Sequence, residues 1–154
     1  LSWKAKKIGV STNFIKLSSK INSKVLSFLK SKIFQVLKEK KIKINKEKIL
    51  ILGVAYKRNI DDYRESASIK LLNTLIKKNV RISFSDPYVK ILETGNKTKK
   101  LKGIRLSPQR IKNFDLVILM TDHEKFNYKM IYKNSRLIID CRGRYNLNQK
   151  VIRG

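Results

Sequence analysis

The sequence has few cysteine, proline, glycine and acidic residues, and it has no long apolar run. Its only cysteine, Cys141, excludes an internal disulfide and makes a reducing, cytoplasmic compartment the default expectation. No stretch approaches the roughly 20 apolar residues of a membrane-spanning helix, so we expect no membrane contact. The first ten residues mix lysines with single apolar residues, unlike a secretory signal peptide. No Met opens the sequence, which is typical of a fragment or a processed product.

Charge is the most unbalanced feature of the composition. The 37 Lys and Arg residues against 11 Asp and Glu give a net charge of +26. A field of this sign attracts polyanions, so a non-catalytic module that binds nucleic acid or another polyanion is one hypothesis. However, most basic residues are lysines spread along the chain, while Ile and Asn are abundant and there are only two prolines. Drift toward AT-rich codons produces this composition, and we favour drift over nucleic-acid binding; a surface suited to a pyrophosphate ligand is the third possibility.

Residues 1–45 form the first unit. Between residues 12 and 41, apolar side chains recur mostly at steps of three and four, which predicts a helix with one apolar face. At 1.5 Å per residue, this helix is about 40 Å long. A helix of that length in a 154-residue chain is typical of one that packs on something larger than its own domain. We expect Trp3 to pack the start of this helix against the body.

Residues 46–154 form the second unit, in which strand and helix patterns alternate. This alternation predicts an α/β fold, namely a Rossmann-like, doubly wound, parallel five-stranded sheet preceded by the long N-terminal helix. Ligands in such sheets bind beyond the carboxyl ends of the strands. The expected strands are residues 49–53, 81–85, 104–106, 116–120 and 137–140, and the expected helices are residues 67–78, a short helix from Pro108, and residues 124–132, with residues 96–102 as a polar loop.

The segment that carries the chemistry follows the first expected strand. Residues 53–66 are too long for a tight turn and are not a G-x-G-x-x-G phosphate loop. Tyr56 offers a ring for stacking, and Lys57 offers a point charge for a phosphate or carboxylate. Arg64 lies just before a helix amino-terminus, where the helix dipole also favours anions. Asp61 and Asp62 are suited to anchoring these cations.

The same segment carries a resemblance. The pattern G-x-A-Y-K-x-N-x-D-D-x-R-E-S over residues 53–66 resembles the opening of the carboxy-terminal domain of the UDP-glucose/GDP-mannose dehydrogenase family. D-P-Y at residues 86–88, T-D-H-x-x-F at 121–126 and D-x-R at 140–142 follow in the family's order. L-x-W-K-A at residues 1–5 extends the match upstream. The branch most resembled oxidises UDP-N-acetylated hexosamines such as UDP-N-acetylglucosamine and UDP-N-acetylmannosamine.

The resemblance implies specific roles. Tyr56, Lys57 and Arg142 would bind the UDP-sugar substrate, and Arg64 would reach the cofactor NAD held by another domain. The long helix would form a homodimer. The family's catalytic Cys, catalytic Lys and NAD-binding domain match nothing in this chain, so we expect no catalytic residue and no metal site here. The full enzyme would oxidise the C6 hydroxyl of a UDP-hexose or UDP-N-acetylhexosamine to the uronate, and this chain alone would not.

Blander interpretations remain open for several of these residues. Arg64 could simply pair with Asp61 or Asp62. Arg142 could be a solvated residue at a strand end, with Arg144 as the competing candidate. Cys141 ends a buried strand and is interpreted as a small core residue. His123 is likewise interpreted as structural, through a cap on the helix that follows it.

Overall fold

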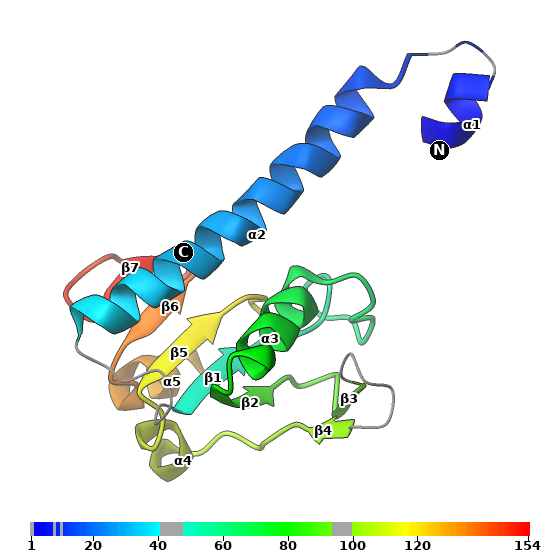
Figure 1. Ribbon diagram of the computed structural model, residues 1–154. Coiled ribbons are helices and arrows are strands. Elements are labelled where there is room, and N and C mark those ends of the chain that lie inside the picture. Colours follow the sequence, from blue (N-terminus) through cyan, green and yellow to red (C-terminus); the bar gives the residue numbers. More distant parts are fainter. Residues whose placement is uncertain (1, 8, 10, 41–47, 94–99) are drawn as a thin grey trace.

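The computed structural model describes residues 2–7, 9, 11–40, 48–93 and 100–154, and they form a layered α/β body with one projecting helix (Figure 1). The predicted boundary between the two units, at residues 45 and 46, lies outside the described residues. The elements are α1 (Ser2–Lys7), α2 (Asn13–Glu39), β1 (Lys48–Leu52), α3 (Ala67–Lys77), β2 (Arg81–Ser85), β3 (Ile91–Glu93), β4 (Lys100–Lys102), α4 (Pro108–Lys112), β5 (Leu116–Leu119), α5 (Tyr128–Asn134), β6 (Ile138–Asp140) and β7 (Val151–Arg153).

The body is built on a five-stranded sheet in the order β2-β1-β5-β6-β7, in which all neighbouring strands are parallel. β1 pairs with β2 on one side and with β5 on the other. The chain therefore adds β2 on one side of β1 and then adds β5, β6 and β7 on the other side. Every residue of β5 and β6 is buried. This is why these strands read as continuous apolar runs in the sequence. The predicted fold class is confirmed.

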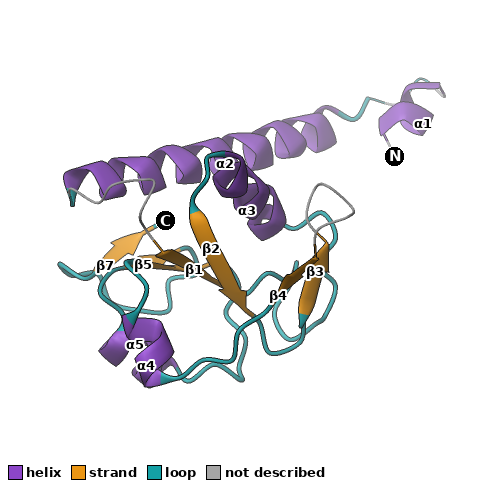
Figure 2. Cartoon of the chain, turned by 60° about the horizontal axis from the view of Figure 1, so that its bottom comes forward, coloured by secondary structure: helices purple, strands orange, loops and turns teal. Residues whose placement is uncertain are grey.

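Helices cover both faces of the sheet (Figure 2). Ile49 and Ile51 of β1 point into a core shared with α2 and α3. Leu50 and Leu52, which alternate with them, point into a second core shared with α4 and α5. Successive side chains of a strand face opposite sides, so a strand covered on both faces needs apolar residues at every position. The sheet is therefore doubly wound.

The long helix α2 has two different halves. Its carboxy-terminal half packs on the sheet through Leu29, Ile33, Val36 and Leu37, all of which are buried. Its amino-terminal half projects beyond the body toward α1 (Figure 1), and its apolar side chains are exposed, with 82% of Phe14 accessible. The other exposed apolar residues of this half are Ile15, Leu17, Ile21, Val25 and Phe28. Among the described residues, no helix is long and apolar enough to span a membrane.

Several predictions about local structure were wrong. Residues 104–106 are not a strand: Ile104 N donates to Phe84 O at 2.8 Å, but the chain does not continue along β2. The fifth strand is instead β7, which lies beside β6. The helix expected over residues 124–132 begins at Tyr128, because the Asn127 side chain caps it by accepting from Met130 N.

Two further predictions near the edges of the molecule were also wrong. Trp3 does not pack on the body: it is 68% exposed, and its ring lies 4.1 Å from Lys7 Nζ. Lys100–Lys102, expected in a polar loop, forms β4 and pairs with β3 in an antiparallel ladder. The rest of that loop, residues 96–99, lies outside the described residues. Neither correction touches the ends of the strands that carry the candidate site.

Candidate functional site

The candidate residues lie on loops that follow the carboxyl ends of β1, β2, β5 and β6. Because these strands are parallel, the loops gather at one edge of the sheet. They are residues 53–66 after β1, 86–90 after β2, 120–127 after β5 and 141–145 after β6. We refer to this edge as the carboxyl edge.

Asp86, directly after β2, is the centre of this edge. Its Oδ1 accepts hydrogen bonds from the backbone N–H groups of Tyr88 at 2.8 Å and Val89 at 3.1 Å. Its Oδ2 accepts from Val54 N at 2.8 Å, Ala55 N at 3.1 Å and His123 Nε2 at 3.0 Å. Burial raises the pKa of this carboxyl, but the hydrogen bonds outweigh burial and lower the pKa to about 2. One buried carboxylate thus connects three of the four loops.

Gly53 brings the loop after β1 close to the loop after β5. It adopts a φ of +77°, and a Cβ at this position would lie 2.2 Å from the carbonyl oxygen of Thr121. Thr121 Oγ1 also donates to Ala55 O at 2.8 Å. Only glycine adopts this backbone conformation without strain and leaves room for the approach. The glycine that opens the loop therefore meets a packing requirement.

The far end of the same loop is held by the first turn of α3. Ser66 caps the helix, as predicted, since its Oγ accepts from Ile69 N at 3.2 Å. The same hydroxyl donates to Val54 O at 2.8 Å, which ties the helix start to the loop start. Tyr56 N donates to Asp62 O at 2.7 Å across the loop. The loop is therefore a compact, internally bonded structure.

Tyr56 and Lys57 stand at the exposed top of this loop. The Tyr56 side chain is 57% exposed, and Lys57 Nζ lies 6.0 Å from the centre of its ring. Lys57 forms no salt bridge with any described residue. An exposed aromatic ring beside an uncompensated cation suits a ligand with a flat base and a phosphate or carboxylate.

Arg64 is paired with Asp62, as one of the two interpretations anticipated. Arg64 Nε lies 3.0 Å from Asp62 Oδ1, and Nη2 lies 3.0 Å from Oδ2. The side-chain hydrogen bond from Arg64 lowers the pKa of Asp62, and the same bond raises the pKa of Arg64. The Arg64 side chain is nevertheless 84% exposed. Its remaining N–H donors stay available to an anion arriving from solvent.

Arg142 lies on a loop organised by a second buried carboxylate. Asp140, the last residue of β6, accepts from Arg142 N at 2.8 Å and Gly143 N at 2.9 Å through Oδ1, and from Tyr145 N at 2.8 Å through Oδ2. The Arg142 side chain reaches across to the loop after β5, where its Nε lies 3.1 Å from Asp122 Oδ1. Arg144 instead lies over the Tyr128 ring at 4.4 Å. Of the two arginines, Arg142 is thus the one paired with the neighbouring loop.

The structure supports the structural interpretation of Cys141 and His123. Burial, with the nearby charge of Asp140, raises the pKa of the Cys141 thiol to about 12, so the reactive thiolate is disfavoured. His123 is fully buried between Asn59 and Asp86 rather than capping α5. Among the described residues, no group of three or more His, Cys, Asp or Glu side chains could hold a metal ion.

A cavity of about 370 Å³ lies beside Asp86, between the loop after β2 and the chain that runs into α4. Its lining includes the apolar side chains of Pro87, Leu106 and Phe126 and the basic side chains of Lys90 and Lys125. Three of its eleven lining residues, Lys90, Arg105 and Lys125, are basic, a share close to the 37 of 154 in the whole chain, so its charge singles out no ligand.

Residues 50–147 match the model of the UDP binding domain of the UDP-glucose/GDP-mannose dehydrogenase family. The matched range contains the four loops of the carboxyl edge up to Tyr145. The chain belongs to this family. The resemblance carried by the loop motifs is confirmed, and the described body is the family's UDP binding domain with the long helix before it.

Curated relatives and solved structures of this family match only part of their own length. The NDP-N-acetyl-D-galactosaminuronic acid dehydrogenase of Ralstonia solanacearum is 30% identical over 102 residues, covering 64% of this chain and 23% of that protein. The UDP-N-acetyl-D-mannosamine dehydrogenase of Pyrococcus horikoshii is 29% identical over 133 residues, covering 83% and 29%. A solved UDP-D-ManNAc dehydrogenase structure from Pyrococcus horikoshii aligns with a TM-score of 0.73 at 23% identity, covering 94% and 33%. The chain therefore spans about a quarter to a third of these relatives.

Sequence reasoning named the exposed residues of this UDP binding domain and missed the buried ones that hold them. Asp86 was noticed only as part of D-P-Y, and Asp140 only as part of D-x-R. Asn59 was not predicted as a site residue, although it adopts a φ of +61° and its two hydrogen bonds to residues 123 and 124 fix its position in the loop. The available signal was an Asp at or directly after the end of each of two strands, because a carboxylate there can accept several amide N–H groups.

Proposed function

We propose that this chain is the UDP-sugar-binding part of an NAD-dependent UDP-sugar 6-dehydrogenase. In the whole protein, the C6 hydroxyl of a UDP-hexose or UDP-N-acetylhexosamine would be oxidised to the uronate in a cytoplasmic setting. The observation that carries the proposal is the exposed pair Tyr56 and Lys57, which lies at the carboxyl edge of a UDP binding domain. Tyr56 stacks on a flat group of the ligand, and Lys57 and Arg142 neutralise its negative charge.

Arg64 is assigned to the cofactor NAD. Its exposed guanidinium, steered by Asp62, fits a phosphate or carboxamide presented by a neighbouring domain. NAD bound to the whole protein would supply the hydride acceptor, and a Cys thiolate contributed from outside this chain would hold the intermediate. Cys141 is poorly suited to that role, because burial raises the pKa of its thiol to about 12 and so disfavours the thiolate.

The proposal includes a homodimer through α2. The exposed apolar residues of its amino-terminal half, Phe14, Leu17, Ile21, Val25 and Phe28, would be covered by a second copy. Sedimentation of the chain should show a dimer at micromolar concentration, and replacing Phe28 by Asn should shift it toward monomer. The matched control is Ile91→Asn, which removes an exposed apolar residue from β3 instead.

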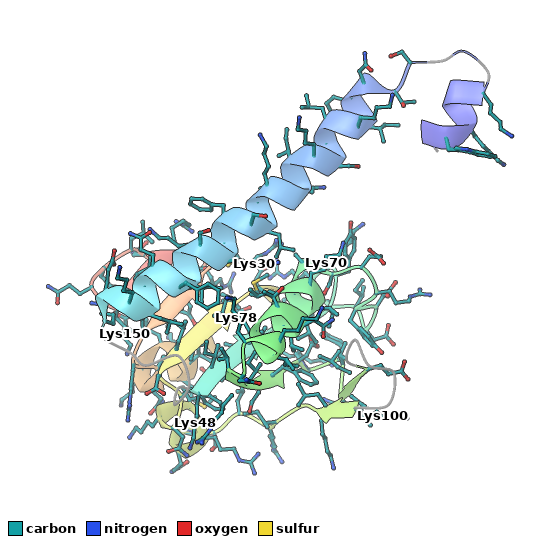
Figure 3. All side chains as sticks on the ribbon, viewed as in Figure 1. Lys30, Lys48, Lys70, Lys78, Lys100 and Lys150 are labelled. Carbon is teal, nitrogen blue, oxygen red and sulfur yellow. The ribbon has the colours of Figure 1, made fainter. Side chains whose placement is uncertain are left out.

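The polyanion alternative receives less support from the placement of the lysines. In Figure 3 the labelled lysines are spread over several elements: Lys30 lies on α2, Lys70 and Lys78 lie at α3 beside it, and Lys48, Lys100 and Lys150 lie elsewhere on the body. A nucleic-acid-binding surface needs basic residues clustered on one face. Tight binding to DNA or RNA that weakens steeply with salt would nevertheless favour this alternative.

Calorimetry at about 150 mM salt tests the main proposal, because salt at that level screens nonspecific attraction beyond roughly 8 Å. UDP should bind more tightly than inorganic phosphate. Lys57→Ala should weaken UDP binding by about tenfold or more, since a charge-assisted contact is lost. Lys100→Ala, on β4, removes the same charge from an exposed site and should leave UDP binding unchanged. Equal binding of UDP and phosphate, or equal effects of the two variants, would refute the proposal.

A further inference from the structure

Residues 56–58 form a short exposed segment that is fixed at both of its ends, and we call it the arch. On one side, Ala55 N donates to Asp86 Oδ2 at 3.1 Å, and Ala55 O accepts from Thr121 Oγ1 at 2.8 Å. On the other side, Asn59 N donates to His123 Nδ1 at 3.0 Å. Tyr56 and Lys57 project from the arch into solvent. Their positions therefore depend on the backbone that carries them.

The ring of His123 provides the anchor at the Asn59 end. A backbone N–H can only donate, so Nδ1 must carry a lone pair and accept from Asn59. The proton then sits on Nε2, which donates to the Asp86 carboxylate at 3.0 Å. The ring is fully buried, and Tyr88 and Phe126 pack against it at centroid distances of 5.2 and 5.6 Å. Both ring nitrogens are thus used, and the imidazole is held as one neutral tautomer.

A second connection joins the same two loops. Asn59 Oδ1 accepts from Glu124 N at 3.0 Å, so Asn59 donates to residue 123 and accepts from residue 124. Arg58, the last residue of the arch, pairs with Glu124 at 3.4 Å. Asn59 adopts a φ of +61°, a left-handed conformation that Asn tolerates better than most residues but that still has an energetic cost. The bonds to the loop after β5 hold this residue in place.

We propose that His123 is a positioning residue for the UDP-sugar site: through its Nδ1 it fixes Asn59 and so holds the arch that presents Tyr56 and Lys57. This inference rests on the proposed function, since it concerns the same ligand. A loop that is already ordered loses less entropy when the ligand binds, so affinity rises without any contact between His123 and the ligand. The hydrogen bond from Nε2 to Asp86 keeps the ring proton on Nε2, so that Nδ1 remains an acceptor.

Two variants of His123 separate the contributions of its two ring nitrogens. In His123→Asn, the side-chain oxygen occupies the place of Nδ1 and can still accept from Asn59, while the bond to Asp86 is lost. In His123→Gln, the terminal amide reaches the place of Nε2 and can still donate to Asp86, while Asn59 loses its acceptor. Each variant loses the ring and one buried hydrogen bond, so their losses of thermal stability should be similar. We expect His123→Gln to weaken UDP binding by about tenfold and His123→Asn to stay within about threefold of the unmodified chain.

Amide hydrogen exchange gives a readout that needs no ligand. The Asn59 amide should be protected in the unmodified chain and in His123→Asn, and it should exchange much faster in His123→Gln. Equal UDP affinity in the two variants, following only their stability, would overturn the positioning role. Should His123→Gln fail to fold, nitrogen chemical shifts of His123 in the unmodified chain decide the matter, and a proton on Nδ1 would overturn the proposal. If the unmodified chain did not prefer UDP to phosphate, the proposed function would fall, while the exchange experiment would still test whether His123 holds the arch.

Discussion

Replacing Asp86 by Asn should destabilise this chain more than any other single-atom exchange at the carboxyl edge. Asn keeps one acceptor oxygen and turns the other into an NH₂ donor. In the less costly orientation of the new Asn side chain, its oxygen still accepts from Val54 N, Ala55 N and His123 Nε2. Its NH₂ group then faces the backbone N–H groups of Tyr88 and Val89, which lose their acceptor. A buried donor without a partner costs about 1–3 kcal/mol, so we expect a loss of about 4 kcal/mol. Since whole domains are stable by about 5–15 kcal/mol, the variant should be marginal at 37 °C.

The pH dependence gives an independent measure of the same carboxylate. The pKa of Asp86 is lowered from 3.8 to about 2 by folding. A carboxyl with a depressed pKa stabilises the fold at pH above its unfolded pKa, and this contribution is lost as pH falls through the folded value. Between pH 7 and pH 2 the unmodified chain should therefore lose about 2 kcal/mol through Asp86 alone. Asp86→Asn lacks this contribution, so the gap between the two proteins should narrow by about that amount.

Urea unfolding followed by circular dichroism at several pH values measures both effects. Asp115→Asn is the matched control, because Asp115 at the opposite end of the sheet accepts from Lys48 N and pairs with the exposed Arg136. Exposed pairs contribute about 0–1 kcal/mol, so this control should remain close to the unmodified chain. The reasoning about Asp86 fails if the two variants are equally stable at pH 7. It also fails if the gap between Asp86→Asn and the unmodified chain does not change with pH.

Three further outcomes test the packing of this edge and the state of the thiol. Gly53→Ala should lower the free energy of unfolding, measured in urea, by more than about 2 kcal/mol, because its Cβ would lie 2.2 Å from the Thr121 carbonyl oxygen in a backbone conformation with φ of +77°. An unchanged free energy of unfolding would contradict this. Ser66→Ala should cost about 2 kcal/mol, since its buried hydroxyl both caps α3 and donates to the preceding loop, and Ser83→Ala on β2 serves as control. Cys141, with a pKa of about 12, should react with iodoacetamide at pH 8 far more slowly in the native chain than in urea, and equal rates would show that the thiol is accessible and ionised.

The central strands were predictable because burial on both faces leaves a strong mark in the sequence. β1, β5 and β6 each consist almost entirely of apolar residues with β-branched members, and the predicted ranges agree within one residue. The outermost strands of the sheet were harder to predict from the sequence. β7 has three residues, of which only Val151 is buried, and it leaves no periodic signal. Residues 104–106 showed a similar short alternation but make one backbone bond to β2 and then turn away toward α4. The local sequence pattern does not show which of two such segments becomes a strand, because strand pairing depends on residues far apart in the sequence.

The candidate site was predictable in its exposed part only. Tyr56, Lys57, Arg64 and Arg142 stand out as residue types that bind nucleotides, and a motif in one continuous segment brings three of them together. The bonds that tie the segment to the other loops connect residues 31 to 66 positions apart in the chain, such as Ala55 with Asp86 and with Thr121. No local pattern contains these pairs. Likewise, the pairing of Arg142 with Asp122 follows from the neighbouring positions of β5 and β6 in the sheet, which only the strand order shows.

The net charge of +26 and the candidate site turn out to be separate features of the molecule. Within residues 53–66, 86–90, 120–127 and 141–145, together with Asp140 at the end of β6, the seven basic residues are matched by seven acidic ones. The basic set is Lys57, Arg58, Arg64, Lys90, Lys125, Arg142 and Arg144, and the acidic set is Asp61, Asp62, Glu65, Asp86, Asp122, Glu124 and Asp140. The excess of lysine therefore lies entirely outside the carboxyl edge.

This balance bears on how the edge distinguishes ligands. Four of its acidic residues, Asp62, Asp122, Glu124 and Asp86, pair with arginine or histidine side chains, so they orient those groups as well as cancelling charge. A uniformly positive edge would attract any polyanion, whereas a neutral edge with placed donors rewards a ligand whose phosphates and base match their positions. Composition drift can add lysines elsewhere on the surface without changing this local arrangement. We therefore expect the specificity of the domain to depend on a few short-range contacts around a buried Asp and His, and not on the field of the whole protein.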